Sequence, residues 1–171
     1  MEMGNSSWRT SEEIAEIYSA HIDAVYRLCY AYMKNTFDAE DAAQDTFIKL
    51  FTEKKRFEST AHERAWLLRV ATNLCKNKLK SKYRYGNQQY IEDVADTHMQ
   101  SLNSASDDST ELFGMILSLP DKYKTIVYMY YYEGYSTKEI AKALKRPPST
   151  IRNQLRDARI LLKNYLGGDS D

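Results

Sequence analysis

The sequence predicts an all-α protein made of two small helical domains joined by an acidic, flexible linker. Three observations support this fold class. Apolar residues recur every three or four positions in several stretches, as expected for amphipathic helices. Two of these stretches begin with a capping box, at Thr10 with Glu13 and at Ser136 with Glu139. Between them, residues 85–110 contain few large apolar side chains, which is typical of a linker without a core.

With 171 residues, of which 43% are hydrophobic and 28% charged, the chain has the composition of a soluble globular protein. No apolar run reaches the roughly 20 residues of a membrane span, and no signal peptide is recognisable, so we expect a cytoplasmic protein. Cys29 and Cys75 lack a CxxC motif or a nearby His, so we expect buried thiols. His21, His62 and His98 are scattered, and no phosphate-binding loop is present. We therefore expect no enzyme, no cofactor and no metal site.

The net charge of zero conceals a segregation of charge along the chain. Positions 1–48 carry nine acidic and three basic residues, whereas positions 49–84 carry eleven basic and three acidic residues. Residues 85–121 contain no Lys or Arg, and the chain then becomes basic again. Two basic segments separated by an acidic one predict two nucleic-acid surfaces.

Residues 10–84 are expected to form the first domain, a bundle of three helices. Apolar periodicity predicts these helices over about residues 10–35, 38–51 and 64–83. The second helix also carries a compact polar strip, formed by Glu40, Asp41, Gln44, Asp45 and Lys49. From the residues alone, this strip is either ordinary solvated surface or a partner-binding face. The third helix directs Trp66 inward and has a dense basic edge.

Residues 111–167 are expected to form the second domain, around a helix-turn-helix at Tyr135–Arg159. The helix that starts at Ser136 must end before Pro147, and Pro148 suits the first position of the next helix. That next helix buries Ile151, Leu155 and Ala158 and leaves an outer polar face, formed by Ser149, Arg152, Asn153, Arg156 and Arg159. Because Arg can bind guanine or phosphate and Asn can pair with adenine, this face predicts DNA recognition. A helical hairpin with a solvated basic face is the alternative.

The segment in front of the helix-turn-helix is expected to support it. A short helix follows from the apolar residues of Leu112–Leu119, and a tyrosine-rich helix comes next. Its aromatic cluster consists of Tyr128, Tyr130, Tyr131, Tyr132 and Tyr135. Most of this cluster should lie in the core, under the recognition helix.

Three segments, in this order, resemble bacterial RNA polymerase sigma factors of the extracytoplasmic-function (ECF, group 4) class. The start of that family's region 2 is similar to YRLCYAYMKNTFDAEDAAQDTFIKLF, and its promoter-melting segment to FESTAHERAWLLRVATNLCKNKLKSKYR. Its region 4 is similar to LPDKYKTIVYMYYYEGYSTKEIAKALKRPPSTIRNQLRDAR. A helix-turn-helix alone is shared by many regulators, whereas all three segments together are specific. The resemblance covers about residues 14–84 and 110–166, and implies a region 2-like bundle followed by a region 4-like bundle.

The resemblance implies three sets of contact residues. The set at the core RNA polymerase comprises Asp41, Gln44, Asp45, Phe47 and Lys49. The set that captures the minus-10 promoter element as single strand comprises Lys55, Arg56, His62, Trp66, Arg69, Asn73, Lys76 and Asn77. The set at the minus-35 element comprises Lys138, Ser149, Thr150, Arg152, Asn153, Arg156 and Arg159. A purely buried core tryptophan is the alternative for Trp66.

The chain also departs from the commoner family pattern. In the turn, Lys145, Arg146 and Pro147 stand where the family often has a Gly, an apolar residue and a Ser. Gln154 and Asp157 stand where basic residues are frequent. These departures leave the mode of DNA binding intact, but they prevent a promoter sequence from being carried over from relatives.

The predicted function is that of a non-enzymatic promoter-specificity factor. It would bind core RNA polymerase, recognise the minus-35 and minus-10 elements of promoter DNA and help to melt the duplex. The resemblance further implies an anti-sigma factor as partner, often membrane-bound, which would hold the protein at the membrane. The linker resembles the family's connector through the RNA path of the polymerase, although a plain solvated linker fits equally. The alternative function is a stand-alone helix-turn-helix regulator in which residues 1–84 form a sensing or dimerisation domain.

Overall fold

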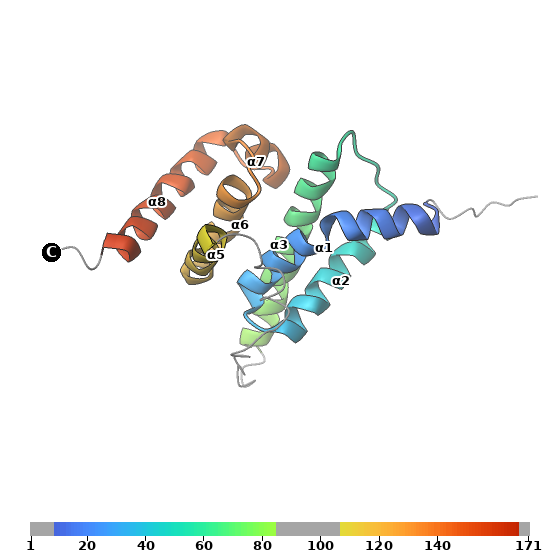
Figure 1. Cartoon of the computed structure of the whole chain (residues 1–171), viewed down its shortest axis with the longest axis horizontal. Helices are drawn as coiled ribbons and strands as arrows, with labels where there is room; N and C mark the ends of the chain where they lie inside the picture. The colour runs from blue at the N-terminus through green and yellow to red at the C-terminus, as the bar shows by residue number, and fades with distance from the viewer. Residues whose placement is uncertain (1–8, 85–106, 168–171) are drawn as a thin grey trace, which may run out of the picture. The chain divides into compact units, whose positions relative to one another are not determined.

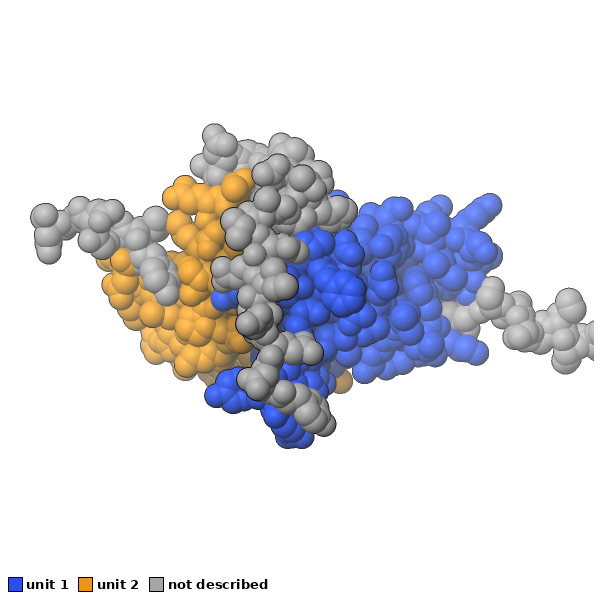
Figure 2. Space-filling model, turned by 90° about the horizontal axis from the view of Figure 1, so that it is seen from below, with its two compact units in different colours: residues 1–91 blue, residues 92–171 orange. Residues whose placement is uncertain are grey.

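The computed structural model describes residues 9–84 and 107–167, which belong to two compact units (Figures 1 and 2). Unit 1 spans residues 1–91 and unit 2 residues 92–171. All regular elements in the described ranges are helical, so the all-α fold class is confirmed. The predicted linker at 85–110 lies outside the described residues, except at its end, where a helix has already begun at Asp107.

Unit 1 is a bundle of three helices, α1 (Ser11–Met33), α2 (Thr36–Glu53) and α3 (Thr60–Arg84). Each helix packs against the other two. The fully buried apolar side chains at their centre include Val25, Leu28, Leu50, Leu67 and Leu68. Burying a side chain of this size stabilises a fold by about 1.5–3 kcal/mol, so this core holds the bundle together.

The capping box predicted at the start of α1 is confirmed, because the Thr10 hydroxyl accepts from the backbone N–H of Glu13 and the Glu13 carboxylate accepts from that of Thr10. The predicted starts of the other two helices are wrong. Helix α2 begins before Asp38, since Asn35 caps it and accepts from the Asp38 N–H at 2.8 Å. Helix α3 begins four residues before Arg64, at Thr60. The Ser59 hydroxyl precedes it and accepts from the backbone N–H of His62 at 3.1 Å.

The two cysteines are buried thiols, as predicted. Cys29 lies on α1 and Cys75 on α3. A hydrogen bond between the two thiols, together with burial, raises the pKa of Cys29 well above its ordinary value of 9.0. Since the thiolate is the reactive form of cysteine, this environment keeps Cys29 inert.

Unit 2 consists of α5 (Asp107–Ser118), α6 (Asp121–Val127), the π-helical turn η1 (Tyr128–Tyr132), α7 (Thr137–Leu144) and α8 (Pro148–Gly167). Helix α8 packs on α6 and α7. The apolar side chains that close this core include Phe113, Ile116, Ile126, Ile140, Ile151 and Leu155. The predicted burial of one face of α8 is therefore confirmed.

The tyrosine-rich segment forms a π-helical turn, which sequence periodicity did not predict. Tyr128 and Tyr135 are buried as expected, and the rings of Tyr128 and Tyr132 stack with their centroids 5.1 Å apart. Tyr130 and Tyr132 are half-buried and Tyr131 is exposed, so the predicted burial of most of the cluster is confirmed only in part.

The helix-turn-helix has the predicted boundaries. Ser136 and Glu139 form the capping box of α7, and Lys145 ends that helix in the left-handed region, with φ of 56°. The Pro147 carbonyl accepts from the N–H groups of Thr150 and Ile151 at the start of α8. Lys145 thus adopts a conformation that usually favours Gly, the residue that the family often has in this turn.

Candidate polymerase and promoter interfaces

Helix α2 carries the polar strip that the sequence assigned to the polymerase. Asp41, Gln44 and Lys49 are exposed on one face of the helix, and Asp45 is half-buried beside them. Phe47 is only 3% exposed and packs on Tyr18, with their ring centroids 5.0 Å apart. Its side chain therefore belongs to the core of unit 1, beneath the polar strip, and its assignment to the polymerase interface stays a prediction.

Two lysines of α3 hold the carboxylates of this strip from the side. The Lys78 ammonium lies 2.7 Å from an oxygen of Asp41 and 2.9 Å from one of Asp45, and Lys82 pairs with Asp38. Burial opposes the charge on Lys78, but its hydrogen bonds to Asp41 and Asp45 outweigh that effect and raise its pKa to about 12. Burial likewise opposes the charge on Asp38, but the hydrogen bonds from Lys82 and Asn35 hold its pKa below its usual range. We call this set the α2–α3 ion-pair ladder.

Two large apolar side chains flank the polar strip, and the sequence analysis missed both. Phe37 is 79% exposed and Ile48 is 58% exposed on α2. Phe37, Asp41, Gln44 and Ile48 follow one another at spacings of four, three and four residues. This spacing places the two apolar side chains on the same helix face as Asp41 and Gln44. An exposed aromatic and an aliphatic side chain at helical spacing form a typical anchor for a protein partner. This spacing was the signal that could have identified them.

The loop between α2 and α3, residues 54–59, contains the first residues predicted to bind the minus-10 element. Lys55 and Arg56 are exposed there, while Phe57 packs on Trp66 with ring centroids 5.7 Å apart. The Lys55 ammonium lies 5.8 Å from the centre of the Trp66 ring. Trp66 is 8% exposed, and its buried indole N–H has no hydrogen-bond partner in the described part of the chain. Trp66 therefore lies beneath the loop and supports it.

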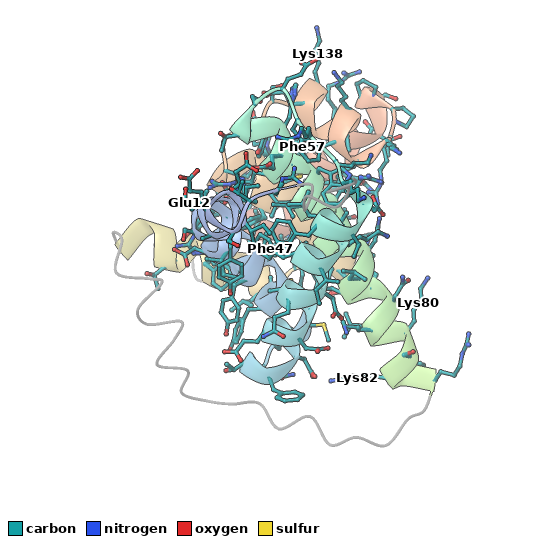
Figure 3. The ribbon with its side chains drawn as sticks, turned by 90° about the vertical axis from the view of Figure 1, so that its right-hand side faces the viewer. Glu12, Phe47, Phe57, Lys80, Lys82 and Lys138 are labelled. Atoms are coloured by element: carbon teal, nitrogen blue, oxygen red, sulfur yellow. The ribbon has the colours of Figure 1, made fainter. Side chains whose placement is uncertain are left out.

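The other predicted minus-10 residues lie along α3. Asn73 and Asn77 are exposed one turn apart, and Arg69 and Lys76 are half-buried beside them. His62 is exposed at the start of the helix, 3.9 Å from the Glu58 carboxylate. Further along, Lys80 is exposed, and Lys80 and Lys82 leave α3 in different directions (Figure 3). The structure thus brings most of the predicted residues to one helix and its preceding loop.

A buried histidine joins α1 to the start of α3. The Nε2–H of His21 donates to the Glu63 carboxylate at 2.9 Å, while its Nδ1 accepts from the Nε–H of Arg64 at 3.2 Å. Arg64 also donates to the backbone carbonyl of Ala20 at 2.7 Å. A ring that accepts at one nitrogen and donates at the other is the neutral tautomer. His21 therefore has a structural role in positioning α3.

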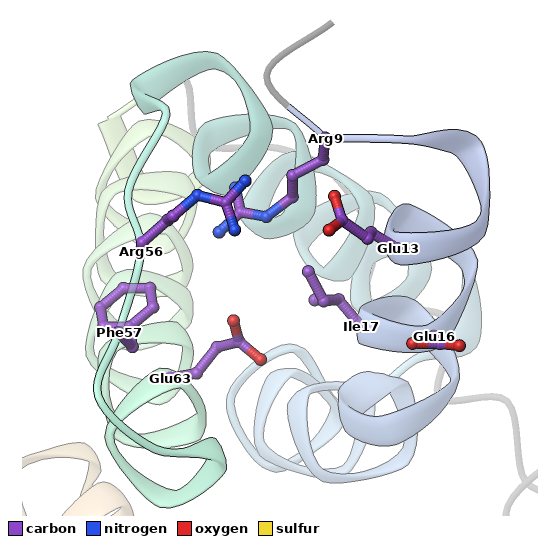
Figure 4. Close-up of a pocket in the computed structure, with 7 residues that line it drawn as sticks. All are labelled: Arg9, Glu13, Glu16, Ile17, Arg56, Phe57 and Glu63. Carbon is purple, nitrogen blue, oxygen red and sulfur yellow. The ribbon is translucent and has the colours of Figure 1, made fainter.

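A cavity of about 200 Å³ opens between the start of α1, the α2–α3 loop and the start of α3 (Figure 4). Its lining combines two cations and three carboxylates with two apolar side chains, from Arg9, Glu13, Glu16, Ile17, Arg56, Phe57 and Glu63. Figure 4 shows the guanidinium groups of Arg9 and Arg56 side by side at one edge of this cavity. The inner side of the loop is thus polar and charged.

Helix α8 presents the predicted outer face. Arg152, Asn153 and Arg156 are exposed, and Ser149 is exposed at the start of the helix. Thr150 is half-buried beside Ser149, and Lys138 projects outward from α7 (Figure 3). Within the described residues, no hydrogen bond or ion pair engages Arg152 or Asn153, so both can bind a ligand without breaking an internal contact. A helix of this kind fits the major groove of DNA.

Arg159 differs from the other predicted minus-35 residues. Its Nε–H donates to the Tyr131 hydroxyl at 2.6 Å, and its guanidinium lies 5.7 Å from the centre of the Tyr130 ring. The hydrogen bond to Tyr131 and the nearby ring raise the pKa of Arg159 above its ordinary value. This arginine is therefore held against η1, at a distance along α8 from Ser149 and Arg152.

Within residues 9–84 and 107–167, no helix combines the length and the apolar character that crossing a bilayer requires. The same residues contain no group of three or more His, Cys, Asp or Glu side chains that could hold a metal ion.

Comparison with known proteins places both units in one family. The family model for Sigma-70 region 2 matches residues 17–85, and the model for Sigma-70, region 4 matches residues 109–162. The ECF RNA polymerase sigma factor SigW of Bacillus subtilis is 29% identical, over 91% of this chain and 89% of that protein. The ECF sigma factor SigE of Mycolicibacterium smegmatis is 30% identical, over 91% of this chain and 62% of that protein.

Solved structures show the same fold. The sigma factor RpoE of Bartonella quintana, in complex with the anti-sigma factor NepR, superposes with a TM-score of 0.72 at 21% identity, covering 94% of this chain and 99% of that one. CnrH, in complex with the cytosolic domain of CnrY, superposes with a TM-score of 0.64 at 18% identity, covering 94% of this chain and 92% of that one.

A region 2 followed by a region 4, on two helical units, defines a sigma factor of the sigma-70 type. Among these, the chain belongs to the ECF family of RNA polymerase sigma factors. It is therefore a promoter-recognising sigma factor, and the stand-alone regulator is not favoured.

Proposed function

We propose that unit 1 docks on core RNA polymerase through α2, and captures the minus-10 element through the α2–α3 loop and α3. Unit 2 would bind the minus-35 element through α8. The assignment of residues 10–84 and 111–167 to these two tasks follows the order of the matched regions. The observation that supports the proposal most directly is that α8 exposes its polar side chains on one face and buries its apolar side chains on the other.

The exposed face of α2 supports the docking step. It offers Asp41, Gln44 and Lys49 for polar contacts and adds the apolar anchors Phe37 and Ile48. A docking surface gains most of its affinity from a few apolar or aromatic anchors within a polar surround. The α2–α3 ion-pair ladder would fix the carboxylates before the polymerase arrives, so less side-chain freedom is lost on binding.

We propose that the protein acts by binding and catalyses no reaction. Each base-pair step that is opened costs roughly 1.4 kcal/mol of stacking, and capture of the unstacked bases must supply this free energy. The loop and α3 provide cations for the backbone and amides for base edges, which are the groups that single strands require. The working site would be the cytoplasm, where the polymerase and the promoter are.

We also propose an anti-sigma factor as a regulatory partner. Of the two superposed solved structures, RpoE of Bartonella quintana is a sigma factor in complex with the anti-sigma factor NepR, and CnrH is in complex with the cytosolic domain of CnrY. In this chain, an inhibitor that covered either the α2 face or the α8 face would block one of the proposed interfaces. Association with a membrane-bound inhibitor would place the protein at the membrane.

Run-off transcription with purified core polymerase tests the proposed function. A promoter is first recovered by in vitro selection from a randomised library with the reconstituted holoenzyme. Core polymerase should then initiate on the duplex promoter only when the protein is present, and a premelted template should reduce this dependence. If the protein bound the duplex tightly without polymerase and supported no initiation, the proposal would be wrong.

A further inference from the structure

Arg9 makes a contact that ties the start of the chain to the α2–α3 loop. It immediately precedes the Thr10 cap of α1, and its side chain is buried, at 5% exposure. One Nη group donates to the backbone carbonyl of Lys55, which lies 46 residues further along the chain. This hydrogen bond should stabilise the loop, because a carbonyl that loses its partner in a part-buried place costs free energy.

A cation is favourable beside the end of α2. The last carbonyls of a helix lack partners within the helix, and the helix C-terminus carries partial negative charge. The last turn of α2 contains no basic residue, and the chain leaves the helix through Lys54 in the left-handed region, with φ of 52°. Arg9, which precedes the cap of α1, adds a buried cation beside this helix end and donates to the Lys55 carbonyl, just beyond the C-cap.

The contact also sets the shape of the loop. Phe57 fixes one side of it on Trp66, and Arg9 fixes the backbone on the other side at Lys55. Between these two anchors, Arg56 is exposed at the edge of the cavity next to Arg9 (Figure 4). The capping box at Thr10 fixes the start of α1 directly after Arg9, and so fixes the position from which Arg9 reaches the loop.

We propose that Arg9 is a positioning residue for minus-10 recognition, because it holds the α2–α3 loop in the conformation that accepts single-stranded promoter DNA. This inference rests on the proposed function, since it assumes that the loop contacts the minus-10 element. It assigns a role in promoter discrimination to the segment before α1, which lies outside the matched region 2 at residues 17–85.

The test compares Arg9→Ala and Arg9→Lys with the wild type in the full-length protein. Lys34→Gln is the matched control, because it removes one exposed positive charge at the opposite end of α1. Amide hydrogen exchange is measured across residues 54–59 in the free protein. Arg9→Ala should speed exchange in this loop about tenfold, as expected for loss of a charged hydrogen bond, while the centre of α3 stays protected. Arg9→Lys should restore much of the protection, and Lys34→Gln should change nothing.

Promoter discrimination is measured with the same variants in the holoenzyme. The ratio of run-off transcripts from the selected promoter to those from single-base minus-10 variants should fall about five- to tenfold for Arg9→Ala. A fall of this size is expected when the loop no longer holds its contacts to the minus-10 bases in place. Discrimination at the minus-35 element, which unit 2 provides, is the internal control and should stay unchanged. Affinity for core polymerase should also stay unchanged.

Unchanged loop exchange in Arg9→Ala would overturn the proposal. Faster exchange with unchanged minus-10 discrimination would also overturn it, and would place the error in the assignment of the loop to the minus-10 element. Loss of discrimination at both elements would show a general defect and count against a positioning role. If Arg9→Ala does not fold by circular dichroism, Arg9→Gln, which loses the charge but keeps a polar side chain of similar length, decides by the same two measurements with the same expected directions.

Discussion

The two units use their charged side chains in different ways. In unit 1, Lys78 and Lys82 are paired with the carboxylates of α2, and Arg9 with a loop carbonyl. In unit 2, Arg152 and Asn153 project from α8 without such contacts in the described part of the chain. Unit 1 therefore offers a surface whose shape is fixed by internal contacts, whereas α8 offers unengaged donors to a ligand.

This difference suits the two targets that we propose. A single strand has no shape of its own, so the protein must supply a preformed site for it. Duplex DNA has a regular groove, and exposed side chains on a rigid helix suffice to recognise it. Substitutions in unit 1 should consequently change stability and function together, whereas substitutions on the outer face of α8 should change DNA binding alone.

The largest effect is expected for Trp66→Ala. This side chain supports the loop from the core, and truncation of a buried Trp costs about 3–5 kcal/mol of unfolding free energy. Trp66→Phe keeps a ring against Phe57 and removes the unsatisfied indole N–H, so it should cost less than about 1.5 kcal/mol. Urea denaturation followed by circular dichroism measures both values. A loss below about 1 kcal/mol for Trp66→Ala would return this residue to a direct role at DNA.

Arg152→Ala tests whether a substitution on the outer face of α8 changes DNA binding without changing stability. It should leave the thermal midpoint unchanged and weaken holoenzyme binding to a minus-35 duplex about 5- to 150-fold if Arg152 contacts a base. If it contacts phosphate, binding should weaken equally on all sequences, and the salt slope should fall by about 1. Fluorescence anisotropy at several salt concentrations separates these outcomes. Lys163→Ala, which removes another exposed cation of α8, is the control. An unchanged affinity would remove Arg152 from the interface.

Local features of the chain could be predicted from the sequence. The capping boxes at Thr10 and Ser136 and the buried face of α8 depend on residues within a few positions of each other. The α3 start was missed because its capping residue Ser59 lies in a polar segment that shows no helical periodicity. The π-turn was missed for a similar reason, since periodicity analysis assumes one regular helix.

Contacts between distant residues could not be predicted. The Arg9 contact and the α2–α3 ion-pair ladder each join positions far apart in the chain, and only the packing of the bundle brings them together. The charge segregation did predict basic residues on α3, but it did not indicate that Lys78 faces α2 rather than DNA. The site residues assigned by resemblance all stay predictions, and Phe47 differs from the others at the polymerase interface in that its side chain is buried in the core of unit 1.

Lys78→Gln measures how strongly the ladder fixes the α2 carboxylates. Because the pKa of Lys78 is raised from 10.5 to about 12 in the folded state, its stabilising effect is fully present below pH 10.5 and is lost as the pH rises through 12. At pH 8 the variant should be less stable than the wild type by about 0.5–1 kcal/mol, and the difference should vanish near pH 12. Urea denaturation at three pH values gives this difference. Lys80→Gln on the same helix should show none, and a difference that persists above pH 12 would contradict the ion-pair explanation.

The smallest effect is expected for Arg159→Ala, and it decides whether the comparison between the units holds along all of α8. Arg159 is engaged with Tyr130 and Tyr131 but exposed, so its loss should lower the stability of unit 2 by less than about 0.5 kcal/mol. DNA affinity should fall less than in Arg152→Ala, because the residue would have to leave its tyrosine partners to reach the duplex. Tyr131→Phe is the matched variant, since it removes the hydroxyl that accepts from Arg159 and keeps the ring. If Arg159→Ala weakened DNA binding as much as Arg152→Ala at unchanged stability, Arg159 would exchange its internal contact for DNA, and an internal contact would not keep a side chain of α8 from the duplex.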